Sequence, residues 1–221
     1  DFNVDNSLMI ESGGSLISGT GNVQISESLT LGGELVQGGG ILNLIKGGTV
    51  GATGKLDMSG SELQLGSALN ITGTLAANSS SSWSGWQGTL DLTSGTLESS
   101  GGIINLNDFT TGANTTLKLS GDTEISSYND TTFGTLELSG NKLTLGGNGG
   151  LILPNTLTMA AGSEIETKGN KLTHANPLQL NSGAITSTGG TLSFAGGVTM
   201  GAQGTLDVTG STLVAAGDLD L

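Results

Sequence analysis

One short phrase recurs along the sequence at a nearly fixed interval, and this repeat limits the folds that the chain can adopt. Copies of it are GTLELSGNKLTLGG at 134–147, GKLDMSGSELQLG at 54–66, GTLDLTSGTLE at 88–98 and GTLDVTGSTLV at 204–214. Apolar residues that open Leu-x-Leu-like segments recur about every 21 residues: Leu8, Leu29, Val50, Leu69, Leu90, Phe109, Leu136, Leu157, Leu178, Val198 and Leu219. Such a period is typical of repeats that bury their apolar faces against their neighbours.

Each interval holds three short segments in which apolar and polar residues alternate, which is the pattern of a strand with one buried face. In the last turns the two further anchors are Ile165 and Leu172, Ile185 and Leu192, and Leu206 and Leu213. Gly, Ser, Asn and Asp fill the gaps, as turns require, and Gly140 with Asn141 is an expected corner. The sequence therefore predicts an all-β fold, a single-stranded parallel β-helix (β-solenoid) of about ten turns of about 21 residues, with three short strands per turn.

Two other repeat or sheet architectures fit the pattern less well. A β-sandwich would show turn signals at roughly 8–12-residue spacing without a longer frame. A leucine-rich repeat would need its L-x-x-L-x-L-x-x-N phrase and helical segments, and the sequence has neither.

The repeat covers residues 1–221 as one continuous β-solenoid, and neither end carries a polar or helical cap. Solenoid ends normally need such caps, so we expect a fragment of a longer protein that continues into flanking domains or associates end to end with other copies. The interval from Phe109 to Leu136 is 27 residues, longer than the others. We expect the extra residues to form a protruding corner loop at 126–134, which contains Tyr128, the only tyrosine.

Composition and charge exclude several classes of partner. The net charge is −13, and the six basic residues are all lysines, so neither nucleic acid nor an anionic membrane surface is an expected partner. The chain has no Cys, which excludes disulfides and thiolate metal sites. It has no apolar run of about 18 residues, so we expect no membrane insertion.

The titratable residues do not form a recognisable catalytic or metal-binding motif. His174, the only histidine, follows the segment KLT and is expected at a corner or on the surface. Five acids fill the middle of Leu-x-Leu pairs and are expected to form a solvated face: Asp57, Asp91, Glu137, Asp207 and Asp220. Calcium-loop motifs are absent. We therefore expect no catalytic residue, no metal and no cofactor.

The stretch NSSSSWSGWQG at 78–88 holds both tryptophans. The spacing places Trp83 near an inward anchor, where it should be partly buried, and Trp86 at a corner, where it should be exposed. An exposed indole ring often stacks on sugars or proteins. If the chain binds a ligand, a host or matrix glycan or protein, the expected contact residues are Trp83, Trp86, Tyr128, Asn129 and Asp130.

The phrase G-T-L-x-L-x-G, as in GTLDLTSG and GTLELSGN, resembles the repeats of bacterial β-solenoid surface proteins, namely autotransporter passengers and filamentous-haemagglutinin-type adhesins. The resemblance implies secretion to the bacterial cell surface and a role as a non-enzymatic extracellular structural or adhesive rod, either a stalk or an adhesin passenger segment. Two alternatives remain: a self-assembling subunit of a surface layer, sheath or fibre, and a polysaccharide-active β-helix enzyme. A polysaccharide lyase with this fold usually needs Arg or Lys beside clustered carboxylates, and this sequence has no Arg, which disfavours the enzyme alternative.

Overall fold

The computed structural model describes residues 1–78, 80–85 and 88–220. These residues form a parallel β-solenoid of about ten turns of about 21 residues, as the repeat predicts, and no helix occurs among them. The chain divides into two compact units, which are described separately. Unit 1 comprises residues 1–104 and 108–111, and unit 2 comprises residues 105–107 and 112–221.

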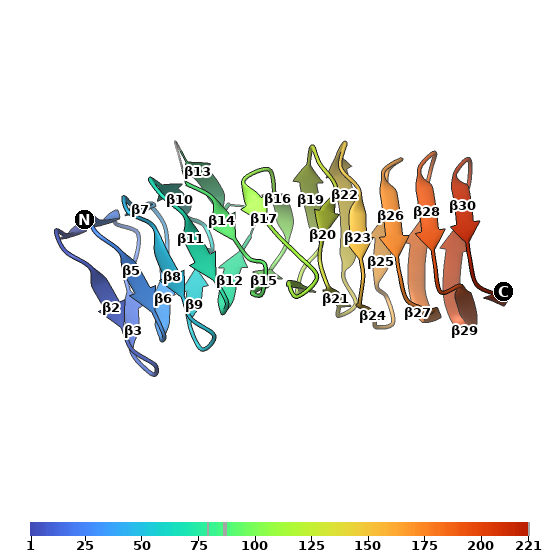
Figure 1. The fold of residues 1–221 in the computed structure, drawn as a ribbon, viewed down its shortest axis with the longest axis horizontal. Coiled ribbons are helices and arrows are strands. Elements are labelled where there is room, and N and C mark those ends of the chain that lie inside the picture. Colours follow the sequence, from blue (N-terminus) through green and yellow to red (C-terminus); the bar gives the residue numbers. More distant parts are fainter. Residues whose placement is uncertain (79, 86–87, 221) are drawn as a thin grey trace. The chain divides into compact units, whose positions relative to one another are not determined.

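Unit 1 contains three stacks of parallel strands, one for each side of its coils (Figure 1). Stack A contains β1 (Phe2–Val4), β4 (Val23–Ile25), β7 (Ile41–Leu44), β10 (Glu62–Leu65) and β13 (Ser82–Gly85). Stack B contains β2 (Leu8–Ile10), β5 (Leu29–Leu31), β8 (Gly48–Val50), β11 (Leu69–Ile71), β14 (Leu90–Asp91) and β17 (Phe109–Thr110). Stack C contains β3 (Ser15–Ile17), β6 (Glu34–Val36), β9 (Lys55–Asp57), β12 (Thr74–Ala77) and β15 (Thr96–Ser99).

Unit 2 has the same three-sided coil. One stack contains β18 (Thr116–Leu119), β21 (Thr135–Leu138) and β24 (Thr156–Met159). A second contains β19 (Thr123–Ser127), β22 (Lys142–Gly147), β25 (Glu164–Glu166), β27 (Leu178–Thr186), β29 (Val198–Asp207) and β31 (Leu219–Asp220). The third contains β20 (Thr131–Thr132), β23 (Leu151–Leu153), β26 (Lys171–His174), β28 (Thr191–Phe194) and β30 (Thr212–Ala215). The strand β16 (Gly102–Asn105) lies where the sequence passes between the units.

The strands β27 and β29 are long because each covers two sides of a coil. Leu178–Leu180 pair with Val198–Met200, and Ser182–Thr186 pair with Gln203–Asp207. The register shifts between Leu180 and Ser182, so a β-bulge turns this corner where other coils use a loop.

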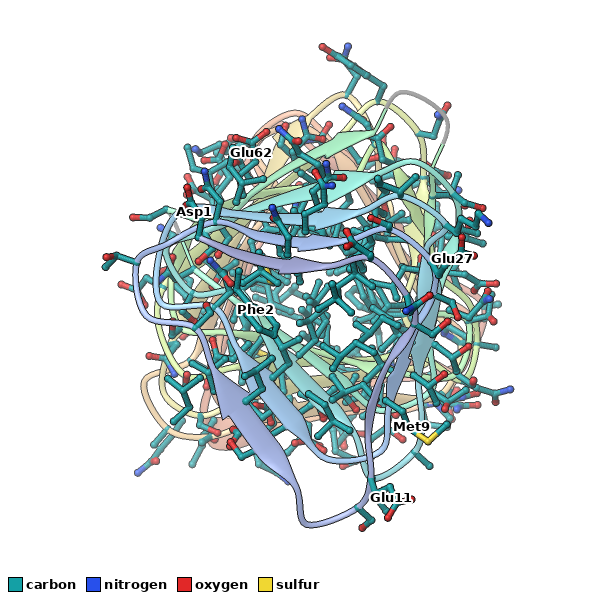
Figure 2. All side chains as sticks on the ribbon, turned by 90° about the vertical axis from the view of Figure 1, so that its left-hand side faces the viewer. Asp1, Phe2, Met9, Glu11, Glu27 and Glu62 are labelled. Atoms are coloured by element: carbon teal, nitrogen blue, oxygen red, sulfur yellow. The ribbon has the colours of Figure 1, made fainter. Side chains whose placement is uncertain are left out.

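Register partners in neighbouring coils confirm the predicted anchor series of the last turns. Leu178 pairs with Val198 and Val198 with Leu219, while Ile165 pairs with Ile185 and Leu172 with Leu192. The anchors face inward and stack on one another, and most are fully buried, including Leu35, Leu42, Leu56, Leu136, Ile165 and Leu192. Figure 2 shows side chains filling the interior of the coils, whereas Met9 and Glu27 point outward. Burial of these apolar stacks is the main favourable term in folding.

The expected protruding loop at 126–134 is wrong, because the long interval does not contain extra residues. Leu136 pairs with Leu117, 19 positions earlier, and Phe109 pairs with Leu90. Phe109 is in β17 of stack B, and Leu136 is in β21, which belongs to a different sheet. The two residues therefore open different sides of the coil. The three sides carry similar Leu-x-Leu phrases. A series of anchors read along the sequence can therefore pass from one side of the coil to another, and the apolar pattern gives no sign of the change. Residues 128–130 form only a short corner between β19 and β20.

The expected corner at Gly140 and Asn141 is confirmed. Gly140 lies between β21 and β22 with φ of +82°, a conformation that glycine adopts without steric cost. The side-chain amide of Asn141 donates to the carbonyls of Leu119 and Ser139, both at 3.2 Å. The corner thereby ties one coil to the preceding one.

Candidate functional site

Trp83 lies in β13 in register with the buried Leu63 of β10. Its ring centroid is 5.2 Å from that of Phe109, and the two planes meet at 80°. Edge-to-face pairs of this kind contribute about 1 kcal/mol beyond area burial. The indole is half-buried, as expected, and its contact with Phe109 links stacks A and B. Trp86 lies outside the described residues.

The three other expected ligand residues lie together at one corner of unit 2. The ring of Tyr128 is 72% exposed, and its backbone N–H donates to Asn107 Oδ1 at 2.9 Å. Asn129 accepts a hydrogen bond from Ser127 Oγ through its carbonyl, at 2.9 Å. Trp83 belongs to unit 1, so the expected residues are divided between the two units.

Asp130 at this corner is engaged with the next coil. Its Oδ1 accepts a hydrogen bond from the N–H of Gly150 at 2.9 Å, and its Oδ2 lies 3.4 Å from Lys171 Nζ. The hydrogen bond from Gly150, with a smaller contribution from Lys171, lowers the pKa of Asp130 below its usual value. At this corner Asp130 is therefore tied to the next coil, whereas the aromatic side chain of Tyr128 is exposed.

The expected corner or surface position of His174 is wrong. His174 is the last residue of β26, and its side chain is only 2% exposed, facing inward in register with Leu153 and Phe194. Nδ1 lies 2.7 Å from the carbonyl oxygen of Asn176, so Nδ1 carries the proton and donates. Nε2 is buried without a partner. Burial lowers the pKa of His174 below its usual value, so the ring packs in the core as a neutral group.

The acids in the middle of Leu-x-Leu pairs do face outward, and three of them perform a structural task that the alternation alone did not indicate. Asp57 accepts a hydrogen bond from the N–H of Ser59, Asp91 from that of Thr93, and Asp207 from that of Thr209, each at 3.0 Å. These are Asx-turns that begin a corner at the end of a strand. The recurring order Asp, any residue, Ser or Thr, in LDMS, LDLT and LDVT, is the sequence signal that could have identified them.

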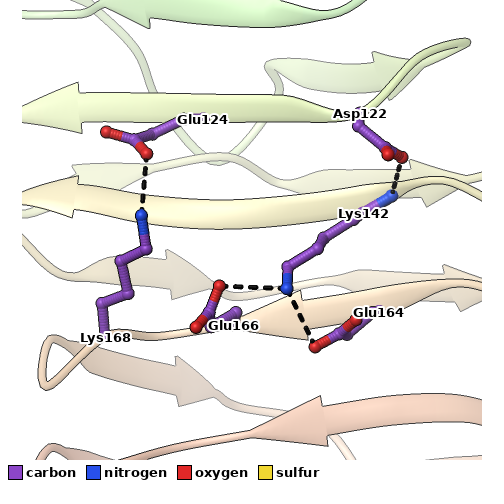
Figure 3. A network of polar contacts seen from close by, with 6 residues as sticks. All are labelled: Asp122, Glu124, Lys142, Glu164, Glu166 and Lys168. Carbon is purple, nitrogen blue, oxygen red and sulfur yellow. Dashed lines mark hydrogen bonds and ion pairs between the residues drawn. The ribbon is translucent and has the colours of Figure 1, made fainter.

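Acids and lysines on the outer face of the β19–β22–β25 stack form an ion-pair network (Figure 3). Lys142 Nζ lies 3.2 Å from Glu164 and 3.0 Å from Glu166, and Lys168 Nζ lies 3.0 Å from Glu124. The hydrogen bond to Glu166 is the largest cause that raises the pKa of Lys142. Elsewhere Lys46, Lys55 and Lys171 also pair with carboxylates. Within residues 1–78, 80–85 and 88–220, no group of three or more His, Asp or Glu could hold a metal ion.

A polar groove on the outer face of stack A was not anticipated from the sequence. Its floor is a row of side-chain amides, one from each of four successive strands: Asn3, Gln24, Asn43 and Gln64. We call this row the amide ladder. The groove has a volume of about 240 Å³ and is also lined by Asn22 and Ile41. The sequence signal was the polar residue between two apolar ones in FNV, VQI, LNL and LQL.

In the described part of the chain no helix is long and apolar enough to cross a membrane. No protein-family model, curated protein or solved structure matches this chain.

Proposed function

We propose that this chain is a non-enzymatic structural or adhesive segment of a bacterial surface protein, exposed outside the cell. The observation that carries the proposal is how the titratable side chains are used. Asp57, Asp91 and Asp207 begin corners, Asp130 binds the next coil, and His174 is packed in the core. Catalysis needs titratable groups that converge on a reacting atom, and these groups instead shape corners, join neighbouring coils or pack in the core.

The outer surface is consistent with the same role. Its ladders consist of short polar and acidic side chains on a regular sheet, as in the row Thr30, Thr49, Asn70 and Asp91 of stack B. The net charge of −13 favours solubility and opposes binding of polyanions. Both properties suit a segment that presents a surface to the medium. The phrase G-T-L-x-L-x-G and its resemblance to bacterial solenoid adhesins support the bacterial location.

Intrinsic tryptophan fluorescence during titration with a panel of glycans and matrix proteins tests the adhesive role. Only Trp83 and Trp86 report in this chain. A saturable shift that Trp86→Ala abolishes would support adhesion at this stretch. Parallel assays for reducing ends and unsaturated sugars should stay blank. Release of either product would replace the proposal with a polysaccharide-active enzyme, and rapid digestion of the native chain by proteinase K would contradict a stable extracellular segment.

Self-assembly is the second candidate, because large apolar side chains are exposed at outward-facing strand positions: Met9 is 65% exposed and Ile103 58%. Light scattering over a range of concentrations tests it. Growth of the scattering mass with concentration would favour a layer, sheath or fibre subunit. A strict monomer at high concentration would argue against it.

A further inference from the structure

We propose that the amide ladder of Asn3, Gln24, Asn43 and Gln64 is a binding site for a neutral, extended glycan chain. The proposal rests on the adhesive function proposed above and names a ligand class and a surface for it. It places that surface on the outer face of stack A, whereas Trp83 of β13 in the same stack lies in register with the inward-facing Leu63.

The backbone holds the four amides in one row. Asn3 pairs with Gln24, Gln24 with Asn43, and Asn43 with Gln64 in parallel register. Their sequence neighbours Val23, Leu42 and Leu63 are buried, so the amides face outward by strand alternation. Neighbouring strands lie about 4.8 Å apart, which repeats the same polar group at a spacing close to the length of one sugar unit.

The fold leaves the hydrogen-bonding capacity of this row almost unused. Among the described residues, the side chains of Asn3, Gln24 and Asn43 make no hydrogen bond, although Gln24 and Asn43 are half-buried in the groove. Amides at corners behave differently: Asn141 and Asn176 donate to backbone carbonyls. None of these amide atoms is among the buried polar atoms without a partner, so the row keeps its donors and acceptors accessible in the groove, where a ligand can use them.

The chemistry of the groove selects a hydroxyl-rich and uncharged ligand. A primary amide offers two donors and an acceptor, which matches sugar hydroxyls that both donate and accept. Glu62 lies on the same face, where its Oε1 accepts from Gln64 Nε2 at 2.9 Å, so an anionic polymer would be repelled. An extended peptide usually binds by adding a strand to a free sheet edge. Here β4, β7 and β10 are each paired on both sides, so a peptide finds no free edge at these three strands.

The test is an NMR titration of the full ¹⁵N-labelled chain, with the side-chain NH₂ groups of Asn and Gln as the reporters. The probes are cellohexaose, chitohexaose, xylohexaose and mannohexaose, with an oligogalacturonate and a neutral extended peptide as comparisons. We expect saturable shifts of the Gln24 and Asn43 amides with at least one neutral hexaose. The double variant Gln24→Ala/Asn43→Ala should weaken that binding about tenfold, the equivalent of about 1.4 kcal/mol.

The matched control is Asn70→Ala, which removes an exposed outward amide from stack B and should leave binding unchanged. The proposal is wrong if none of the hexaoses shifts the ladder amides, if the double variant binds as well as the parent chain, or if the peptide or the oligogalacturonate gives equal shifts. A lower melting temperature of the double variant than of Asn70→Ala, without a glycan response, would assign the row to strand stability. A tryptophan response without a ladder response would overturn this site and leave the adhesive function standing.

Discussion

The interior of unit 2 contains one ionisable ring, and its ionisation opposes folding. His174 is packed between Leu153 and Phe194 with Nε2 unpartnered, and burial lowers its pKa below the value of 6.5 that it has in an unfolded chain. The folded protein therefore binds fewer protons than the unfolded chain as pH falls through 6.5. Stability rises with pH across this window and is lost as pH falls toward the lowered folded pKa.

The direction of this pH dependence gives a prediction, because His174 is the only histidine of the chain. The free energy of unfolding should fall between pH 7.5 and pH 5.5, with a slope of at most about 1.4 kcal/mol per pH unit. His174→Leu, which repeats the Leu153 of the preceding coil, should flatten the dependence in this window. Urea unfolding of both proteins at several pH values measures it. An unchanged slope in the variant would show that other groups cause the dependence.

A second single-residue prediction concerns backbone strain. Among the described residues, Lys168 is the one non-glycine residue with a left-handed φ, at +46°, which costs an L-residue about 1–2 kcal/mol. Lys168→Gly and Lys168→Ala both remove the exposed pair with Glu124, a contact of small value, but only glycine relieves the strain. Lys168→Gly should therefore be about 1 kcal/mol more stable than Lys168→Ala in chemical unfolding. Equal stabilities would contradict the strain at this corner.

At the scale of the strand and its corner, the Asx-turn is the recurring device. The carboxylate of Asp91 accepts the N–H of Thr93 directly after β14. Asp91→Ala should cost about 1 kcal/mol by leaving this N–H without its acceptor, whereas Asp91→Asn keeps a side-chain oxygen in place and should cost much less. Thermal unfolding of the two variants distinguishes them. A loss of the same size in Asp91→Asn would mean that charge, rather than the turn, is what matters.

Strands were predictable from the sequence because each buries one face, and corners such as Gly140 were predictable because they need special backbone conformations. The assignment of each strand to a side of the coil was only partly predictable. Phe109 and Leu136 open similar phrases on different sides, and apolar spacing alone does not distinguish the sides. The inward position of His174 follows from the alternation in KLTH. The prediction of a corner or surface position relied instead on the polar character of histidine at the end of a strand.

The candidate sites were harder to predict than the strands. Trp83 and Tyr128 were identifiable as rare residue types, but their different surroundings depend on register. The amide ladder required knowledge of which residues lie above one another. Asn3 and Gln64 are far apart in the sequence, and only the parallel pairing of four strands brings their amides into one row.

At the scale of the whole molecule, each coil contacts mainly its neighbours. A core substitution should therefore destabilise its own coil and the adjacent ones more than distant coils. Leu42→Ala in unit 1 removes a fully buried side chain at a cost of about 2–5 kcal/mol. We expect faster hydrogen exchange in β4, β7 and β10 and little change in β26, β28 and β30. Leu192→Ala in β28 should give the reverse pattern, and exchange measured by mass spectrometry would show it. A uniform rise throughout the chain in both variants would contradict local behaviour.

The parallel register also bears on how such a gene can change in length. Lys55 and Thr74 are register partners in β9 and β12, so excising the codons for residues 55–73 would bring Thr74 into the place of Lys55 with every later side chain on its original face. Losing a single codon inside a strand would instead reverse the faces that follow within it. Unequal recombination that adds or removes a whole coil should therefore disturb the packing of this molecule little. Loss of a single residue inside a strand, which keeps the reading frame, should disturb it more.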